Sequence, residues 1–402
     1  MQKHRKYVLV SSVCSEQEYD AIHTDDAYKT SQSIIRFGRL FCQGFVANGK
    51  TVEAYSARPT DKKRCGRTIL PAKTETVDGV RYQYATGVYI RRLKHLYTLI
   101  RAFLLFMKKS TCTKNDVVIY DPLVLSWSMG AVAACRLRGI TAVALITDVP
   151  ICYAYNRGSI STHQQQAYRL GTKADAFIFL TEKMNELMNP KGKPYIVMEA
   201  LADETMQHRT VTDDERYAHP VVMYAGGVEE MYGLDMLVEG FVKADVPNAE
   251  LHIYGAGRYV DQLKEWAKQY PQIQYKGCKS NAAVVAEQTK VTLLVNPRYT
   301  DAEYTQYSFP GKNVEYMSSG TPVLFTKLPG MPTDYYPYVY LLEEENADAM
   351  ATALRDILTT DRQTLAAFGA RAKKWVLENK VARVQVGRCI TFFEDLQNKR
   401  KR

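Results

Sequence analysis

The sequence predicts an α/β fold of two domains, and three observations support this prediction. The chain has 402 residues, enough for two or three domains of about 150 residues each. Short β-branched runs alternate with longer amphipathic stretches, which is typical of parallel sheets covered by helices. One polar, charged segment, 203–219, interrupts the alternation. We therefore expect two Rossmann-like domains, 1–205 and 206–380, with a C-terminal helix at about 381–402 that packs back on the first.

In the first domain the strand 7–13 is expected to lead into a helix, 27–48, because apolar residues there recur near helical spacing. Asn48-Gly49 ends that helix, and a polar loop around Pro59 follows the second strand. The other expected strands of this domain are 51–55, 117–120, 142–146, 176–180 and 195–198. In the second domain we expect strands at 221–224, 251–254, 291–295, 322–325 and 339–342, and helices at 234–244, 259–269 and 347–358. An amphipathic stretch, 381–397, lies beyond the last strand.

Composition excludes several classes of protein. With 46% hydrophobic residues, 23 Gly and 15 Pro, the chain is neither disordered nor collagen-like. The eight Cys form no C-x-x-C pair and do not cluster with His, so neither a zinc knuckle nor a disulfide framework is expected. Free thiols favour a reducing compartment, and the apolar run near the N-terminus is too short for a secretory signal. We expect a cytoplasmic protein.

Positive charge is concentrated in the first half of the chain. Residues 1–200 carry 29 Lys and Arg against 16 Asp and Glu, whereas residues 201–402 carry 24 against 27. This excess of positive charge in residues 1–200 would favour binding to anionic lipid, nucleic acid or a phosphorylated substrate. The alternative is that it only keeps the protein in solution. The segment 91–109 has basic ends and an apolar middle that Arg101 interrupts, and it is too short to cross a bilayer. It is either an interfacial helix facing anionic headgroups or a buried helix with solvated ends.

Glycines follow several expected strands of the second domain. They are Gly226, Gly227, Gly255, Gly257 and Gly277. In open α/β sheets, ligands bind beyond the carboxyl ends of the strands, where bare backbone amides and helix N-termini suit phosphate. The alternative is that each glycine only makes an ordinary strand-to-helix turn.

The segment 295–332 combines a strand end with a polar helix start. Arg298 follows the strand, and Ser308 and a Pro-Gly pair precede a helix that carries Lys312, Asn313 and Glu315. A lysine complements phosphate as a point charge, and a carboxylate one turn later can accept two hydrogen bonds from a ribose diol. The alternative is an exposed (i, i+3) ion pair.

These residues resemble the donor site of glycosyltransferase family 4, the retaining sugar transferases of GT-B fold, in particular bacterial members that build capsule, O-antigen or exopolysaccharide. The motifs between 221 and 358 are YAGG, GLDMLVEGF, AELHIYGAG, NPR, SFPGKNVEYMSSGTPVL and LPGMP; those of the first half, ITDVP, FIFLTEKM and PYIVMEAL, match more loosely. The resemblance implies two domains that face each other across a cleft, the first binding the acceptor and the second a nucleotide-diphosphosugar. It implies a hexosyltransferase, and a UDP-sugar is the commonest donor in that family. The cationic first half and the segment 91–109 fit a glycan acceptor linked to polyprenyl diphosphate at the inner face of the membrane, and a cytosolic glycan or a small acceptor is the alternative.

Carried over by position, the resemblance implies ribose binding by Glu315 and donor contacts by the glycines, Ser308 and Asn313. The chain departs from the family pattern at three points: Tyr307 replaces the first Glu of the Glu-seven-residues-Glu motif, and no basic residue stands near Gly227 or Tyr232. Arg298 and Lys312 are the nearest replacements for that basic pair, with the Gly226-Gly227 amides as further donors. No D-x-D motif occurs, so we expect no metal ion and no other cofactor.

The resemblance further implies transfer with retention, in which the departing phosphate takes the proton of the acceptor. Lys312 and Arg298 stabilise the leaving group, and Asp148 orients a hydroxyl or acts as a base. Alternatively, Asp148 caps the turn before Pro150. Arg157 is a second candidate of the first domain for the diphosphate.

Two other functions fit parts of the sequence. A UDP-sugar 2-epimerase shares the two-domain architecture and differs in changing the sugar when no acceptor is present. A nucleic-acid binder would suit the isoelectric point near 9.0, but basic residues interleaved with aromatic ones are missing, so we expect no nucleic-acid partner.

Overall fold

The structure is a computed structural model that describes residues 5–23, 32–90, 93–150, 160–209 and 211–401. The chain divides into two compact units, and each has its own sheet. The N-terminal unit comprises Met1–Leu201 and Val381–Arg402, and the C-terminal unit comprises Ala202–Lys380. The predicted α/β class is confirmed.

The N-terminal unit contains an eight-stranded sheet of order β10-β9-β8-β7-β1-β2-β5-β4. All its pairs are parallel except β4 with β5. The strands are β1 Lys6–Ser11, β2 Thr51–Ser56, β4 Lys73–Val77, β5 Val80–Tyr84, β7 Val117–Tyr120, β8 Thr141–Ile146, β9 Ala176–Phe179 and β10 Tyr195–Val197, beside a separate pair of β3 Ile69–Leu70 and β6 Gly87–Val88. The central strands are buried because helices cover both faces, which explains their β-branched runs.

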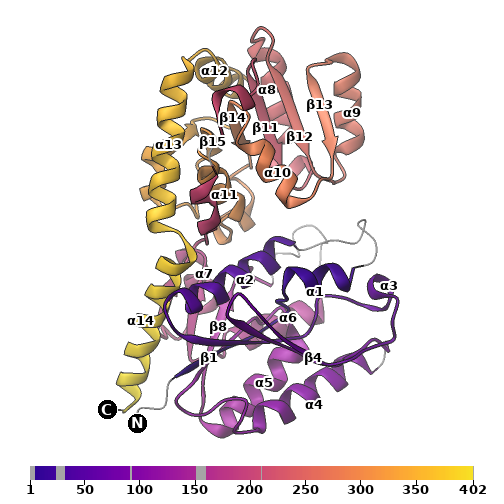
Figure 1. Ribbon diagram of the computed structural model, residues 1–402, viewed down its shortest axis with the longest axis vertical. Helices are drawn as coiled ribbons and strands as arrows, with labels where there is room; N and C mark the ends of the chain where they lie inside the picture. Colours follow the sequence, from indigo (N-terminus) through magenta and orange to yellow (C-terminus); the bar gives the residue numbers. More distant parts are fainter. Residues whose placement is uncertain (1–4, 24–31, 91–92, 151–159, 210, 402) are drawn as a thin grey trace. The chain divides into compact units, whose positions relative to one another are not determined.

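Helices α2 and α14 cover one face of this sheet, and α4 and α5 cover the other (Figure 1). The helices of the unit are α1 Glu16–Ala21, α2 Gln32–Ala47, α3 Lys62–Cys65, α4 Lys94–Met107, α5 Leu125–Arg138, α6 Thr162–Gly171, α7 Glu182–Met188 and α14 Ala382–Lys401. The last helix packs so closely on α2 that a Cβ on Gly44 would meet the Val386 side chain at 2.5 Å. The expected start of α2, 27–31, lies outside the described residues.

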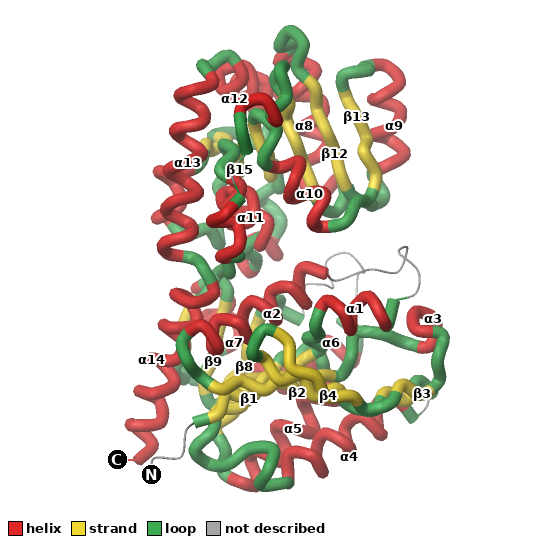
Figure 2. The backbone as a smooth tube through the Cα atoms, in the orientation of Figure 1, coloured by secondary structure: helices red, strands yellow, loops and turns green. Residues whose placement is uncertain are grey.

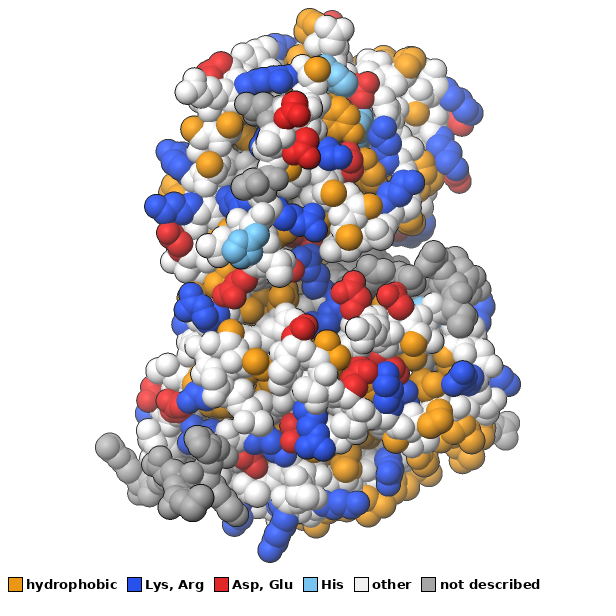
Figure 3. Space-filling view, in the orientation of Figure 1, with side chains coloured by type: hydrophobic (Ala, Val, Ile, Leu, Met, Phe, Trp, Pro, Cys, Tyr) orange, Lys and Arg blue, Asp and Glu red, His pale blue; other side chains and the backbone are white. Residues whose placement is uncertain are grey.

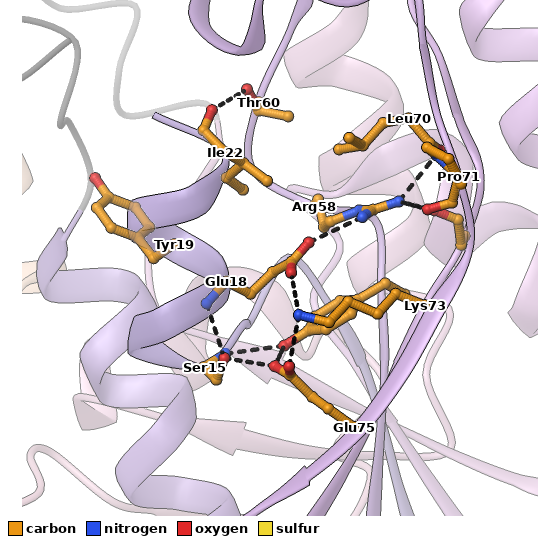
Figure 4. A network of polar contacts seen from close by, with 12 residues as sticks. Ser15, Glu18, Tyr19, Ile22, Arg58, Thr60, Leu70, Pro71, Lys73 and Glu75 are labelled. Carbon is orange, nitrogen blue, oxygen red and sulfur yellow. Dashed lines mark hydrogen bonds and ion pairs between the residues drawn. The ribbon is translucent and has the colours of Figure 1, made fainter. Parts of the chain in front are cut away.

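The antiparallel β4–β5 pair lies in the region beyond Pro59, where the sequence analysis placed only a polar loop. Its turn is Asp78-Gly79, with both φ angles positive, a dipeptide that favours tight hairpins. A polar network fastens this hairpin to α1 (Figure 4). In it, Glu18 pairs with Arg58 at 2.9 Å and with Lys73 at 2.7 Å, and Lys73 also pairs with Glu75.

The C-terminal unit contains a six-stranded parallel sheet of order β13-β12-β11-β14-β15-β16, as Figure 2 shows in part. The strands are β11 Val221–Ala225, β12 Glu250–Tyr254, β13 Ile273–Gly277, β14 Leu293–Asn296, β15 Val323–Thr326 and β16 Tyr340–Leu342. The α-helices are α8 Leu234–Ala244, α9 Val260–Gln269, α10 Asn281–Gln288, α11 Gly311–Ser319, α12 Ala347–Leu358 and α13 Arg362–Asn379. Short 3₁₀ helices are η3 Glu204–His208, η4 Asp213–Glu215, η5 Glu230–Tyr232, η6 Glu303–Tyr307 and η7 Thr333–Tyr338. Among the strands and α-helices of this unit, β13, α10 and α13 were not predicted.

The strand order of this sheet reverses between β11 and β14. From β11 the chain adds β12 and β13 on one side, and β14, β15 and β16 follow on the other. Such a switch point opens a crevice beyond the carboxyl ends of the two central strands. The residues that follow β11 and β14 are therefore the first place to look for a ligand site.

Candidate functional site

Two cations meet beyond the carboxyl ends of β11 and β14. Arg298 follows β14, and Lys312 stands in the first turn of α11, which begins after Pro310. The Lys312 ammonium donates a hydrogen bond of 3.1 Å to the Tyr224 hydroxyl and lies 4.2 Å from the centroid of that ring. Burial, followed by the charge of Arg298, lowers the pKa of Lys312 to about 7. Near neutral pH this amine therefore gains or loses a proton readily.

The Arg298 guanidinium lies against two tyrosine rings. Its Cζ is 4.6 Å from the ring centroid of Tyr232 and 5.8 Å from that of Tyr304. Nη1 makes one long contact, 3.4 Å, with the Ser308 hydroxyl, and Nε is buried with no hydrogen-bond partner. Among the described residues, neither Arg298 nor Lys312 has a carboxylate within ion-pair distance. The pair thus offers an anion the charge of Arg298 and the hydrogen-bond donors of both side chains.

The glycine turns allow β11 and β12 to approach each other closely. A Cβ on Gly226 would collide with the Lys312 ammonium, one on Gly255 with the Gly226 carbonyl, and one on Gly257 with the Val228 carbonyl. The amides of Gly226 and Gly255 donate to the carbonyls of Tyr254 and Gly277, each at 3.0 Å. The expectation that the Gly226 amide is a free phosphate donor is therefore wrong, since β12 already engages it. Gly227 follows in the same turn, and its carbonyl accepts from the Tyr224 hydroxyl at 2.7 Å.

Gly277 does not belong to this group. It ends the edge strand β13, and β12 separates that strand from β11. Its positive φ of 70° fits a turn residue, and nothing lies within 4 Å of a Cβ built on it. The predicted donor contact at Gly277 is corrected to a turn at the edge of the sheet.

Glu315 lies one helical turn after Lys312 and is positioned by a buried amide. Gln288, which is wholly buried at the end of α10, donates from Nε2 to Glu315 Oε1 at 2.9 Å. The backbone carbonyl of Gln288 in turn accepts a hydrogen bond from the Thr321 hydroxyl at 2.6 Å. Lys312 bonds to a tyrosine and Glu315 to a glutamine, so the two do not form the exposed ion pair that was the alternative interpretation.

Asn313 and Tyr316 hold α11 against the sheet. Asn313 is wholly buried, and its Oδ1 accepts a 2.7 Å hydrogen bond from Asn296 at the end of β14. Asn313 therefore fastens α11 to β14, while its Nδ2 is buried with no hydrogen-bond partner, and its contact with the donor stays a prediction. The Tyr316 hydroxyl contacts the Ala225 amide at 2.8 Å and the Ala225 carbonyl at 3.0 Å. These two contacts position Lys312 and Glu315 relative to the end of β11.

Sequence reasoning missed several of these residues. Tyr224, Tyr232 and Tyr304 support the two cations, and Gln288 and Tyr316 position the helix. Only the first two had a signal, because Tyr224 precedes the Gly226-Gly227 turn and Tyr232 stands where the resemblance expects a basic residue. The others depend on packing between segments far apart in the chain.

The N-terminal unit carries two carboxylates beyond neighbouring strands. Asp148 follows β8 as expected, and Asp121, which was not predicted, follows β7 and is buried. Burial, with a contribution from the charge of Asp148, raises the pKa of Asp121 to about 7 although the Leu123 amide donates to it. Asp121, Thr147 and residues of β1 and α2 line a small pocket. Arg157 lies outside the described residues.

The described residues hold neither a cluster of metal ligands nor a membrane-spanning helix. No three His, Cys, Asp or Glu side chains gather as a metal site would require. Among these residues no helix has both the length and the hydropathy needed to cross a bilayer.

Comparison with known proteins agrees with this fold. Residues 213–375, which include the two cations and Glu315, match the family model of glycosyl transferases group 1. No curated protein matches the chain. The match and the fold together support a glycosyltransferase of GT-B type.

Solved structures with the same fold span almost the whole chain. Sucrose-phosphate synthase from Thermosynechococcus elongatus is similar with a TM-score of 0.73 and 15% identity, over 98% of this chain and 100% of that one. The Escherichia coli trehalose-6-phosphate structure bound with UDP-2-fluoroglucose has a TM-score of 0.65 and 11% identity, over 97% and 98%. Anabaena HepE in complex with UDP has a TM-score of 0.64 and 11% identity, over 98% and 100%. At these identities the likeness shows the fold alone, and the predicted GT-B architecture is confirmed.

Proposed function

We propose that the protein transfers a sugar, with retention, from a nucleotide-diphosphosugar to a hydroxyl of a glycan acceptor, as a member of glycosyltransferase family 4. The proposed donor is a UDP-sugar, and the solved structures that hold UDP or UDP-2-fluoroglucose support this choice of base. The proposed acceptor is a lipid-linked glycan of a bacterial surface polysaccharide. The polysaccharide role rests on the resemblance of the motifs, and the lipid link rests on the excess of positive charge in the first half of the chain and on the segment 91–109.

One observation carries the proposal: two cations without acidic partners lie at the switch point of the C-terminal sheet, and a carboxylate, Glu315, follows one of them, Lys312, by one helical turn. Arg298 and Lys312 are suited to a diphosphate, because both keep unused donors, neither has a carboxylate partner, and Lys312 can take up a proton as the anion binds. Glu315, held by Gln288, is suited to the two hydroxyls of a ribose. Arg298, stacked on Tyr232, brings charge to the position where the resemblance expects a basic residue.

The chemistry follows from where charge develops. As the bond between sugar and phosphate breaks, negative charge grows on the leaving diphosphate, and Arg298 and Lys312 stabilise it. The acceptor oxygen bonds to the anomeric carbon on the face that the diphosphate leaves, and its proton passes to the departing phosphate. The bond to phosphate is thus replaced by a bond to the acceptor with the same configuration. Asp148, with Asp121 beside it, orients the acceptor hydroxyl. We propose that no metal ion is needed, since the two side chains supply the positive charge.

Titration with UDP-glucose tests the donor site. Arg298→Gln is expected to weaken binding about tenfold to a hundredfold, because one charge-assisted contact to phosphate is lost. Arg258→Gln is the matched control, since Arg258 is an exposed arginine of the same unit that pairs with Glu229 at 2.8 Å. Equal affinities of the two variants would contradict the donor site.

Incubation with UDP-sugars tests the reaction type. Without an acceptor the protein is expected to release free sugar slowly and to leave the configuration of the sugar nucleotide unchanged, with or without EDTA. Formation of the 2-epimer would support the epimerase instead, and loss of turnover in EDTA would contradict metal independence.

A further inference from the structure

Helix α4 of the N-terminal unit presents a row of large apolar side chains to the solvent. The residues Leu93, Leu96, Ile100, Leu104 and Met107 are 41% to 58% exposed. At about 100° per residue they fall within a sector of about 80° on one side of the helix. Figure 3 shows hydrophobic side chains on the edge of the unit where Figure 1 places α4. We call these five residues the α4 stripe.

The opposite side of α4 is fixed against α5, so the exposure of the stripe follows from packing. Ala102 and Phe106 are wholly buried there. A Cβ on Gly130 of α5 would collide with the Leu99 carbonyl and lie 2.8 Å from the Ala102 Cβ. Because the glycine lets the two backbones approach so closely, α4 cannot rotate to bury its stripe.

Basic residues line one flank of the stripe. Lys94, Arg101 and Lys108 recur every seven residues, which places them on one side of the helix, about 60° to 100° from Leu93. From residue 79 to residue 115 the sequence contains eight Lys and Arg and no Asp or Glu. The surface therefore combines apolar side chains with uncompensated positive charge.

We propose that the α4 stripe docks on an anionic lipid bilayer, with the helix lying in the plane of the interface. Apolar side chains beside a basic flank are the pattern of helices that insert shallowly among acidic headgroups. With 14 residues, α4 is about 21 Å long, shorter than the hydrocarbon core it would have to cross. A second copy of the chain fits this surface less well, since two stripes packed together would bring like charges into proximity.

This docking goes beyond the proposed glycosyl transfer and is tested without any sugar nucleotide. The probe is sedimentation with vesicles of equimolar phosphatidylglycerol and phosphatidylcholine, compared with vesicles of phosphatidylcholine alone. The full-length protein is expected to bind the anionic vesicles and to be released by high salt. Binding equally well to both kinds of vesicle, or to neither, would overturn the proposal.

Two sets of variants separate the apolar and ionic contributions. Leu96→Ser with Ile100→Ser is expected to reduce partitioning more than tenfold. Leu137→Ser is the matched control, because Leu137 is 73% exposed on α5, outside the stripe, and its variant is expected to bind like the parent. Arg101→Gln with Lys108→Gln is expected to weaken binding about thirtyfold, at about fivefold for each charge near the surface.

Two further measurements keep these results interpretable. An unchanged circular dichroism spectrum and an unchanged midpoint of unfolding in urea show that a stripe variant is folded, and their loss calls for the charge variants as the decisive test. Light scattering tests whether a second copy of the chain, instead of a bilayer, covers the α4 stripe. Concentration-dependent dimers that disappear in Leu96→Ser with Ile100→Ser, while vesicle binding persists, would overturn the proposal in favour of an interface between two copies.

Discussion

The protonation of Lys312 gives the sharpest test of the donor site. Its pKa of about 7 arises first from burial and then from the neighbouring Arg298. A bound diphosphate brings negative charge to this ammonium and must raise that pKa toward the ordinary value of 10.5. Binding of the donor and binding of a proton are therefore linked, and the site takes up a proton when the donor binds above neutral pH.

The size of the effect follows from the pKa. With a value of about 7, Lys312 is about nine-tenths protonated at pH 6, half at pH 7 and about one-eleventh at pH 8. Donor binding is then expected to take up about 0.1, 0.5 and 0.9 protons at these three pH values. The apparent affinity falls about tenfold between pH 6 and pH 8, because more of the free protein must first be protonated.

Calorimetry in buffers of different ionisation enthalpy measures this uptake directly. UDP-glucose is the suitable probe, because its diphosphate remains ionised throughout this pH range. The slope of the observed enthalpy against the ionisation enthalpy of the buffer is the number of protons taken up. Lys312→Gln is expected to abolish the slope at pH 8, whereas Lys264→Gln, at an exposed lysine of α9, is expected to preserve it. Zero uptake at all three pH values, or uptake that survives in Lys312→Gln, would refute the reasoning.

Three further predictions concern positioning, acid stability and packing. Gln288→Leu removes the amide that orients Glu315 and is expected to weaken UDP-glucose binding about tenfold in a calorimetric titration, while proton uptake at pH 8 is preserved. For Glu75, burial alone would raise the pKa, but hydrogen bonds, led by that of Lys73, outweigh it and hold the pKa below the ordinary 4.5. Its contribution to stability is therefore present above about pH 4.5 and lost as the pH falls through the lower pKa of the folded state, so the melting temperature of Glu75→Gln is expected to change less in acid than that of the parent. Gly255→Ala forces a Cβ into a backbone carbonyl of the β11 turn at a φ of 132° and is expected to lower the free energy of unfolding by about 2–4 kcal/mol in urea.

Each of these has a matched control at an exposed or open position. Gln272→Leu is expected to leave donor affinity unchanged, and Glu265→Gln is expected to preserve the acid dependence of the melting temperature. Gly311→Ala has open space for a Cβ and is expected to change stability little. If the melting temperature of Glu75→Gln falls as much in acid as that of the parent, the result contradicts the role of the network around Glu18 (Figure 4).

Local patterns were sufficient to predict most strands of the two sheets and the segments that carry the candidate site. The strands of the C-terminal unit are short apolar runs bounded by Gly and Pro, and the expected helices 234–244 and 347–358 coincide with α8 and α12. The turn before α11 was also predictable, because Pro310 and Gly311 mark a helix start after a loop. These features depend on neighbouring residues, which the sequence displays directly.

Contacts between distant segments could not be predicted. The stacking of Arg298 on Tyr232 joins residues that follow two different strands, and the bond between Gln288 and Glu315 joins two helices. The Gly226 amide was expected to be free because its partner, the Tyr254 carbonyl, lies on a neighbouring strand. By contrast, the hairpin at Asp78-Gly79 was predictable from neighbouring residues, because an Asp-Gly dipeptide favours a tight turn.

A crystal structure of the protein grown with UDP-glucose tests the central claim most directly. We expect the two phosphates within hydrogen-bonding distance of the Arg298 guanidinium and the Lys312 ammonium, and the ribose hydroxyls on the Glu315 carboxylate. A nucleotide bound elsewhere, such as beside Gly277 at the edge of the sheet, would contradict it.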